Sequence, residues 1–489
     1  MINDNNISKG IVLRNMAWKF GERIGGQLVS FFISIILARI LMPEDYGLIA
    51  MVLVFVNIAE VFVTHGIGQS LIQKKNADEI DFSSIFFLSL ILSLFLYTII
   101  FFTAPTIASY YGFDILSSVL RVLGIKLFFS AINTVQNAYI ARRMMFKRNF
   151  YSSIISNVLS FVIGLFFAIK GYGVWALVAQ QITSSLTITI VLWFTVKWRP
   201  TLHFSLSRVT KLFSFGWKIQ LAGLSTVFAN EIRQLLIGKL YTSQDLAFYN
   251  RGASFPRIVS DNTIIPISAV IFPVASQYQD DRARLKELAR RYVRITSFFV
   301  LPLLAGIAAS APSLIDVLLT EKWLPSVPYL QIACFSYAII IIQIAIQDAI
   351  NALGRSDIFL YMDIVRKAIG LTILFLVMKQ GVMAIALTTF IIGPISVLMV
   401  MMVSRKMLGY KYKEHLFDNA PILFSAIVMG GVVYVIGFLD LSSILTLIIQ
   451  IIVGFVTYFI LSKYLRLEGY SFAKEYLIKI KNKINEWNR

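Results

Sequence analysis

The chain has 489 residues, of which 57% are hydrophobic, and its mean hydropathy is +0.75. Soluble domains are usually about 45–50% apolar, whereas the excess here falls in blocks of about 20 apolar residues, the length that crosses a bilayer. The composition therefore predicts a polytopic membrane protein and excludes an ordinary soluble domain, while the single cysteine, Cys334, excludes an internal disulfide.

The apolar runs predict an all-α polytopic membrane protein with about fourteen transmembrane helices. In chain order the first repeat holds helices at about 20–41, 46–70, 82–104, 115–140, 151–169 and 173–196. The second repeat holds helices at about 213–240, 247–275, 291–311, 328–350, 358–378 and 382–404, and two more follow at about 420–439 and 442–462. Because each repeat holds an even number of helices, both repeats should enter and leave on the same side of the membrane.

The two repeats are visible as collinear matches about 200 residues apart. The segment Leu37–Ala50, which joins the first two apolar runs, has a relative at Ile237–Asn250. Other matches keep nearly the same offset: Trp18–Lys19 with Trp217–Lys218, Ala104–Pro105 with Ala311–Pro312, Gly173–Ala176 with Gly381–Ala384, and Asn137–Ala138 with Asn351–Ala352. A duplicated unit predicts two six-helix lobes.

This organisation predicts the following domain boundaries. They are a cytoplasmic segment at 1–19, a first lobe at 20–200, a second lobe at 201–410, two further helices within 411–466, and a cytoplasmic tail at 467–489. The tail alternates apolar and lysine side chains at helical spacing, which is typical of an amphipathic helix lying at the membrane interface. The charged stretch 280–291 is expected to form a short helix of its own on the cytoplasmic face.

The distribution of the basic residues predicts the orientation. Most of the 45 Lys and Arg residues fall in segments that share one side if both termini are cytoplasmic, as the positive-inside rule expects. The net charge of +19 would also suit a nucleic-acid-binding protein. The basic residues, however, are concentrated in short loops expected beside the anionic cytoplasmic leaflet, and that position explains the charge better. No nucleic-acid partner is therefore expected.

Charged residues inside the predicted helices are the candidates for the functional site. Each costs roughly 2.5–3.5 kcal/mol on insertion scales, so such residues generally have a role. The candidate cavity residues are Glu22, Arg23, Glu60, Lys126, Glu231, Arg233, Arg251, Arg257 and Asp261. With Arg121 and Lys218, the basic residues outnumber the acidic ones, which favours an anionic passenger. The alternative is that these residues only form ion pairs between helices, and Arg257 and Asp261 are correctly spaced to pair on one helical face.

No motif for soluble catalysis is present: the chain has no Walker loop, no Gly-rich dinucleotide turn and no His-x-x-Glu-His sequence. We therefore expect a transporter and not an enzyme, with no cofactor.

Several segments resemble one transporter family. Leu37–Ala50, Asn137–Lys147, Gly171–Val178 and Ala247–Gly252 are similar to the polysaccharide-transporter family, within the multidrug/oligosaccharidyl-lipid/polysaccharide exporter superfamily. The resemblance covers the whole chain and is closest to the branch that flips lipid-linked repeat units of O-antigen, capsule or exopolysaccharide. It implies two lobes around a V-shaped, basic central cavity in a bacterial inner membrane.

The resemblance also implies a passenger, an undecaprenyl-pyrophosphate-linked oligosaccharide. Cavity arginines would hold its diphosphate, with Arg23, Arg251 and Arg257 at matching places, and its lipid tail would lie in a groove on the membrane. Transport would be coupled to a proton or sodium gradient or to membrane potential. Polysaccharide polymerase and glycosyltransferases are the implied protein partners, besides membrane lipids.

Three other classes remain as alternatives. A multidrug or small-solute antiporter of the same superfamily would be expected to carry surplus acidic residues, and here the surplus is basic. A polytopic glycosyltransferase or polymerase usually needs large outer loops, and the predicted outer loops are short. A purely structural scaffold would not need charges within the membrane.

The orientation can be tested with an impermeant thiol reagent. A cysteine introduced at Asp440 should react from outside the cell, and one introduced at Arg284 should react only after permeabilisation, because basic loops resist translocation. Labelling in the opposite sense would show that the predicted orientation, and with it the predicted direction of transport, is wrong.

Overall fold

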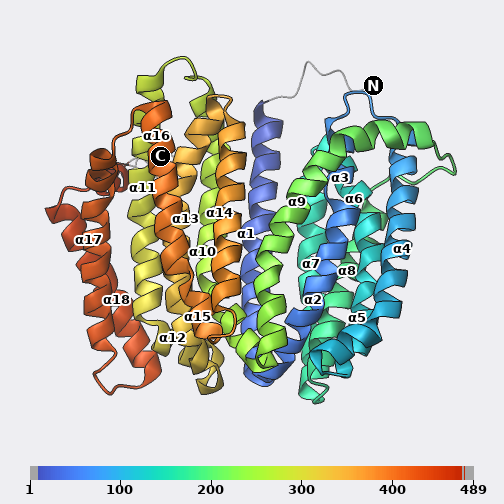
Figure 1. Ribbon diagram of the computed structural model, residues 1–489, viewed down its shortest axis with the longest axis horizontal. Coiled ribbons are helices and arrows are strands. Elements are labelled where there is room, and N and C mark those ends of the chain that lie inside the picture. The colour runs from blue at the N-terminus through green and yellow to red at the C-terminus, as the bar shows by residue number, and fades with distance from the viewer. Residues whose placement is uncertain (1–8, 476–477, 479–489) are drawn as a thin grey trace, which may run out of the picture. The chain divides into compact units, whose positions relative to one another are not determined.

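The computed structural model describes residues 9–475 and Ile478, apart from some side chains within the helices. All regular structure in this part of the chain is helical, which confirms the predicted all-α polytopic fold. The chain forms two compact units, divided between Ala247 and Phe248, and each is a bundle of helices (Figure 1). The units are described separately below, and the lobe boundary expected near residue 200 stays a prediction.

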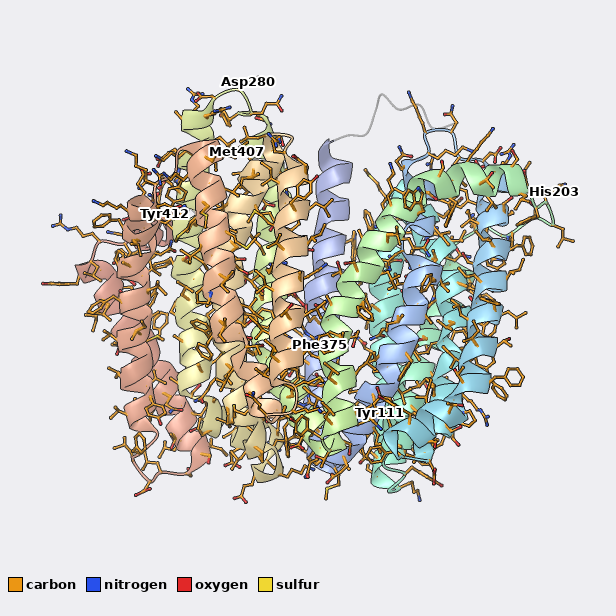
Figure 2. All side chains as sticks on the ribbon, in the orientation of Figure 1. Tyr111, His203, Asp280, Phe375, Met407 and Tyr412 are labelled. Carbon is orange, nitrogen blue, oxygen red and sulfur yellow. The ribbon has the colours of Figure 1, made fainter. Side chains whose placement is uncertain are left out.

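The first unit contains a helix at each apolar run predicted before residue 241. The helices are α1 (Lys9–Ile40), α2 (Pro43–Thr64), α3 (Ile67–Gln73), α4 (Glu79–Tyr111), α5 (Ile115–Gly124), α6 (Lys126–Arg142), α7 (Phe146–Ile169), α8 (Val174–Thr195) and α9 (Leu206–Leu240). Helix α9 belongs to this unit because it packs along α2, α3 and α4. Figure 2 shows Tyr111 and His203 at opposite ends of the unit, as the predicted alternation of helices requires.

The second unit contains the remaining predicted helices. They are α10 (Ser243–Ser276), which begins in the first unit, α11 (Arg282–Ala309), α12 (Ala311–Leu319), the 3-10 helix η1 (Glu321–Ser326), α13 (Val327–Ala352), α14 (Ser356–Val377), α15 (Val382–Leu387), α16 (Thr389–Leu408), α17 (Tyr412–Ile436) and α18 (Ser443–Tyr464). Residues 468–475 form a further short helical stretch. Helix α11 is the centre of this unit, since it packs against both α13 and α17.

All fourteen predicted spans correspond to helices of the structure. Ten helical segments of the described chain are long and apolar enough to cross a membrane. The other four predicted spans correspond to α1, α9, α10 and α14, which have 32, 35, 34 and 22 residues and are therefore also long enough to span. Three of the four, α1, α9 and α10, hold most of the candidate cavity residues.

Several spans predicted as single helices are interrupted. The run 46–70 divides at Gly66, whose φ of +74° suits glycine, and a Cβ atom there would lie 2.2 Å from the carbonyl oxygen of Gly216. The run 115–140 divides at Ile125, and the run 382–404 divides at Thr388. The charged stretch expected as a short helix at 280–291 is helical from Arg282, but it is the first part of α11, which continues into the apolar run.

In the first unit an ion-pair network joins the start of α4 to the start of α9. Asp81 is fully buried and accepts hydrogen bonds from Lys74 at 2.6 Å and from Arg208 at 3.5 Å. Arg208 also binds Asp78, whose side chain caps α4. Burial alone would raise the pKa of Asp78, but the hydrogen bond and charge of Arg208 hold it below its usual range.

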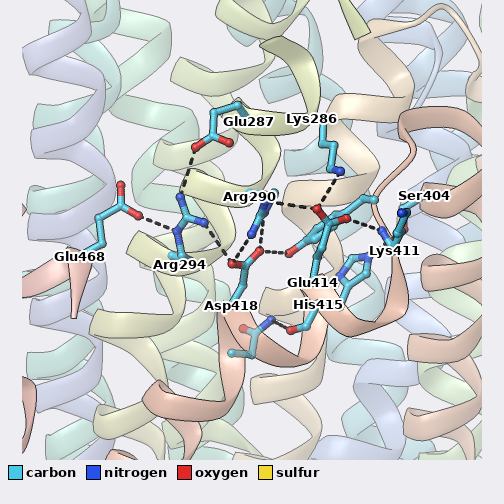
Figure 3. A network of polar contacts seen from close by, with 12 residues as sticks. Lys286, Glu287, Arg290, Arg294, Ser404, Lys411, Glu414, His415, Asp418 and Glu468 are labelled. Carbon is cyan, nitrogen blue, oxygen red and sulfur yellow. Dashed lines mark hydrogen bonds and ion pairs between the residues drawn. The ribbon is translucent and has the colours of Figure 1, made fainter. Parts of the chain in front are cut away.

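In the second unit a larger network joins α11 to α17 (Figure 3). We call Arg290, Arg294, Glu414, Asp418 and Glu468 the α11–α17 network. The Asp418 side chain is only 5% exposed and accepts from Arg290 Nε at 2.8 Å, from Arg294 Nη1 at 3.0 Å and from the Tyr410 hydroxyl at 2.6 Å. Arg294 also binds Glu468, which follows α18. The network therefore fastens the α17–α18 hairpin to α11.

Replacing Asp418 with alanine should destabilise the protein strongly. Arg290 and Arg294 are only 24% and 20% exposed, so both would lose their shared partner, and breaking a buried pair costs up to about 3–5 kcal/mol. Thermal unfolding of the purified protein in detergent should show this loss of stability. Asp357→Ala is the matched control, because Asp357 pairs with Arg355 in the open, both 50% exposed, where a pair contributes about 0–1 kcal/mol. Equal losses in the two variants would contradict the assigned role.

Candidate functional site

A row of half-buried polar side chains crosses the apolar interior of the first unit. We call it the polar row; it consists of Asn57 and Glu60 on α2, Lys126 and Ser130 on α6, Gln181 on α8, and Glu231 and Gln234 on α9. On each helix that contributes two members, they are three or four residues apart and so share one face. The sequence thereby turns polar groups from four helices toward one region of the bundle.

Two of the predicted charges lie together in this row. Glu60 accepts a hydrogen bond from the Ser130 hydroxyl, and Lys126 donates from Nζ to Gln181 Oε1 at 3.1 Å. The charge of Glu60 also acts on Lys126, so the two candidates lie within electrostatic range of each other. Because α2, α6 and α8 pack together, these contacts connect three helices through one carboxylate and one ammonium group.

The third predicted charge of the row, Glu231 of α9, is linked to α2 through Asn57. One carboxylate oxygen accepts from Asn57 Nδ2 at 3.1 Å, and the other accepts from Gln234 on its own helix. Arg233, also on α9, is half-buried. The first unit therefore brings Glu60, Lys126 and Glu231 into one polar row by way of uncharged partners.

The candidates of α10 lie in the second unit. The Arg251 guanidinium lies over the ring of Trp323, 5.0 Å from its centroid, which is a cation–π contact. Arg257 is exposed, Asp261 is half-buried, and the charges of both act on Tyr337 of α13. The i,i+4 pairing of Arg257 with Asp261 stays a prediction.

Two candidates fall where the structure gives no side chains. Glu22 and Arg23 lie on α1, and their side chains are outside the described residues. In the part of the chain that is described, no cluster of three or more His, Cys, Asp or Glu residues is placed to hold a metal ion.

The second unit also contains a long apolar groove, which we call the α18 groove. Its volume is about 910 Å³, and α11, α12, α17, α18 and the stretch after α18 line it. Aromatic and aliphatic side chains such as Phe298, Leu303, Ile451 and Phe455 form most of its surface. Along α18 the lining runs from Leu447 to Ser462, which is roughly 22 Å at 1.5 Å per residue.

Sequence reasoning missed the uncharged members of the polar row. Asn57, Ser130, Gln181 and Gln234 give no charge signal within an apolar run. For Asn57, Ser130 and Gln234, a spacing of three or four residues from a charged residue was the available clue, since such pairs lie on one helix face. Gln181 gave no such clue, because α8 carries no charged residue. The α18 groove could not be seen from any single helix, because four helices and the stretch that follows them form its walls.

Comparison with known proteins places the chain in a family. Residues 36–328 match the family described as polysaccharide biosynthesis protein. A curated relative is the succinoglycan biosynthesis transport protein ExoT of Rhizobium meliloti, which is 24% identical over 355 residues and covers 73% of this chain and 72% of its own length.

Solved structures show the same fold. The inward closed conformation of the lipid II flippase MurJ matches with a TM-score of 0.77 at 16% identity, covering 92% of this chain and 99% of its own. An inward-facing multidrug resistance transporter of the MATE family, from the MOP superfamily, matches with a TM-score of 0.60 at 16% identity, covering 78% of this chain and 95% of its own. At these identities the likeness concerns the fold.

The interaction between Glu60 and Lys126 can be measured with a double-mutant cycle. If each charge stabilises the other, the variant carrying both Glu60→Gln and Lys126→Gln should be more stable than the sum of the single effects, by about 0.5–3 kcal/mol. Thermal unfolding of the purified protein in detergent is the measurement. Lys170→Gln, at an exposed lysine after α7, is the control, and its effect on stability should add to that of Glu60→Gln with no interaction energy. Additivity in both cycles would show that Glu60 and Lys126 act separately.

Proposed function

The chain belongs to the polysaccharide biosynthesis protein family, and from this premise we propose that it is a flippase for lipid-linked polysaccharide repeat units. The passenger is an undecaprenyl-pyrophosphate-linked oligosaccharide, which moves from the cytoplasmic to the outer leaflet of a bacterial inner membrane by alternating access. No covalent chemistry is assigned to the protein.

The α18 groove is the observation that carries this proposal. A passenger with a long lipid tail needs an apolar surface that follows the membrane normal. The groove extends over roughly 22 Å of α18, most of a hydrocarbon core of about 30 Å, and nearly all of its lining is apolar. A small soluble solute has no use for so long a surface, so the groove favours a lipid-linked passenger.

The charged residues support the polar half of the same passenger. Arginine binds phosphate oxygens through a planar fork of donors. Arg251 and Arg257 of α10, together with Arg23 of α1, are the residues we assign to the diphosphate. In the first unit the polar row supplies amide and hydroxyl groups, which are the partners that sugar hydroxyls need.

A multidrug or small-solute antiporter is the second candidate, because the polar row holds the carboxylates Glu60 and Glu231, which would suit a cationic solute. The two proposals differ in what the arginines do. A cationic drug gains nothing from Arg251 or Arg257, whereas a diphosphate depends on them.

Coupling, topology and partners complete the proposal. Both termini lie in the cytoplasm, and a proton or sodium gradient drives the cycle, with the half-buried carboxylates of the polar row as the groups that would bind the ion. The protein then delivers its passenger to a polysaccharide polymerase and receives it from glycosyltransferases.

Substitution of the arginines tests the proposed function. Arg23→Gln, Arg251→Gln and Arg257→Gln keep length and polarity but remove the charge. Each should lower surface polysaccharide in a flippase-deficient strain by about tenfold or more, since a charge-assisted hydrogen bond contributes about 1.5–3 kcal/mol. Lipid-linked repeat units should accumulate inside. Lysine at the same positions should restore transport in part, because it keeps the charge and loses the fork.

The comparison requires matched protein levels in the membrane. Arg282→Gln is the control, because Arg282 is an exposed arginine at the start of α11 and should leave transport unchanged. Full polysaccharide from all three glutamine variants would contradict the assignment of the diphosphate to these residues. Export of cationic drugs that depends on Glu60 and Glu231 would favour the antiporter.

A further inference from the structure

The short helical stretch after α18 is docked on α11 at one end of the α18 groove. Leu467 is 5% exposed and packs into a core cluster with Phe298. Glu468 pairs with Arg294 and, at 3.4 Å, with Arg291. A Cβ atom on Gly469 would lie 2.2 Å from the Phe298 ring, so only glycine allows this approach.

Tyr470 completes the docking. Its ring lies edge-on to the ring of Phe459 on α18, with 5.4 Å between the centroids. The Tyr458 hydroxyl, on the neighbouring residue of α18, donates to the carbonyl oxygen of Phe298 at 2.7 Å. Residues 467–470 are therefore held between α11 and α18, which sets the direction of the residues that follow.

The docked stretch turns one face toward the groove. Tyr470 and Lys474 both line it, and their spacing of four residues places them on one face of the helical stretch. Ile478 also lines the groove. Phe472, halfway between the first two, is not part of the lining. Lys474 therefore lies among the groove residues because the docking of residues 467–470 directs the helical stretch along the groove.

Lys474 is the charged member of an otherwise uncharged surface. Of the described residues that line the groove, only Lys474 carries a charge, and it lies at the end that the positive-inside rule places in the cytoplasm. Phosphate groups of membrane lipids lie at that depth, where an apolar chain in the groove would end in its headgroup. An apolar channel capped by one ammonium group is complementary to a lipid chain that ends in an anion.

We propose that Lys474 binds the phosphate of a single-chain polyprenyl phosphate whose tail occupies the α18 groove, and that residues 467–470 position it. The ammonium group donates to the phosphate oxygens at the predicted cytoplasmic end. This site would hold the lipid carrier before its headgroup reaches the arginines of α10. The inference rests on the proposed function and adds a loading site for its passenger.

Native mass spectrometry of the purified full chain tests the site, with undecaprenyl phosphate as the probe. Lys474→Gln should weaken binding about tenfold, the size expected for one charge-assisted contact, and Lys474→Arg should largely keep it. The uncharged alcohol undecaprenol should bind both forms equally, which shows that the groove is intact. Lys463→Gln is the matched control, because Lys463 is an exposed lysine at the end of α18 outside the groove lining.

The outcomes separate this inference from the proposed function. Equal binding of undecaprenyl phosphate to the wild type and to Lys474→Gln would overturn the role of Lys474 while leaving the flippase proposal intact. Phosphatidylglycerol is the second anionic probe. If Lys474→Gln weakens the binding of phosphatidylglycerol as much as that of undecaprenyl phosphate, the assignment to a polyprenyl lipid is overturned and the site is a general one for anionic lipids. No binding of undecaprenyl phosphate to the wild type would overturn the loading site, and the flippase would then be judged by surface polysaccharide alone.

Discussion

Charge within an apolar helix bundle must be matched by partners, because no bulk water is available to solvate it. The second unit satisfies this constraint at Asp418, where two arginines and a tyrosine hydroxyl surround one carboxylate. The first unit satisfies it with ion pairs at Asp81 and, within the polar row, with uncharged partners, since Glu60 and Lys126 are bound by Ser130 and Gln181 and interact through charge. The same requirement thus produces the α11–α17 network, which fastens helices together in the second unit, and the polar row in the interior of the first unit.

Helix α11 connects the α11–α17 network to the groove in the second unit. Arg290 and Arg294 lie at its polar end, and Phe298, one turn further on, contacts the stretch after α18 and lines the groove. An apolar groove between a fixed helix and the α17–α18 hairpin keeps its width only if the hairpin is held in place. The α11–α17 network supplies that restraint at the end where the groove meets Lys474, so stability and the proposed lipid site depend on the same contacts.

The candidate site could be predicted from the sequence only in part. Glu60, Lys126 and Glu231 were recognisable because a charge in an apolar run is costly, and the structure brings them into one row. Their neutral partners escaped notice because serine, asparagine and glutamine are only mildly unfavourable in such runs. Asp418 escaped for another reason: the predicted helix 420–439 began after it, whereas α17 begins at Tyr412 and carries it inside.

The sequence by itself determined that the chain is helical and lies in a membrane, where its helices are, and to which family it belongs. These properties depend on hydropathy and motifs, which are local and can be read along the chain. Only the tertiary structure decided which charges have which partners and where a groove forms. Arg294 finds Asp418 and Glu468 more than a hundred residues away, and Lys474 faces the groove because Gly469 and Glu468 dock on α11. Such choices depend on packing between distant helices, and no local pattern contains them.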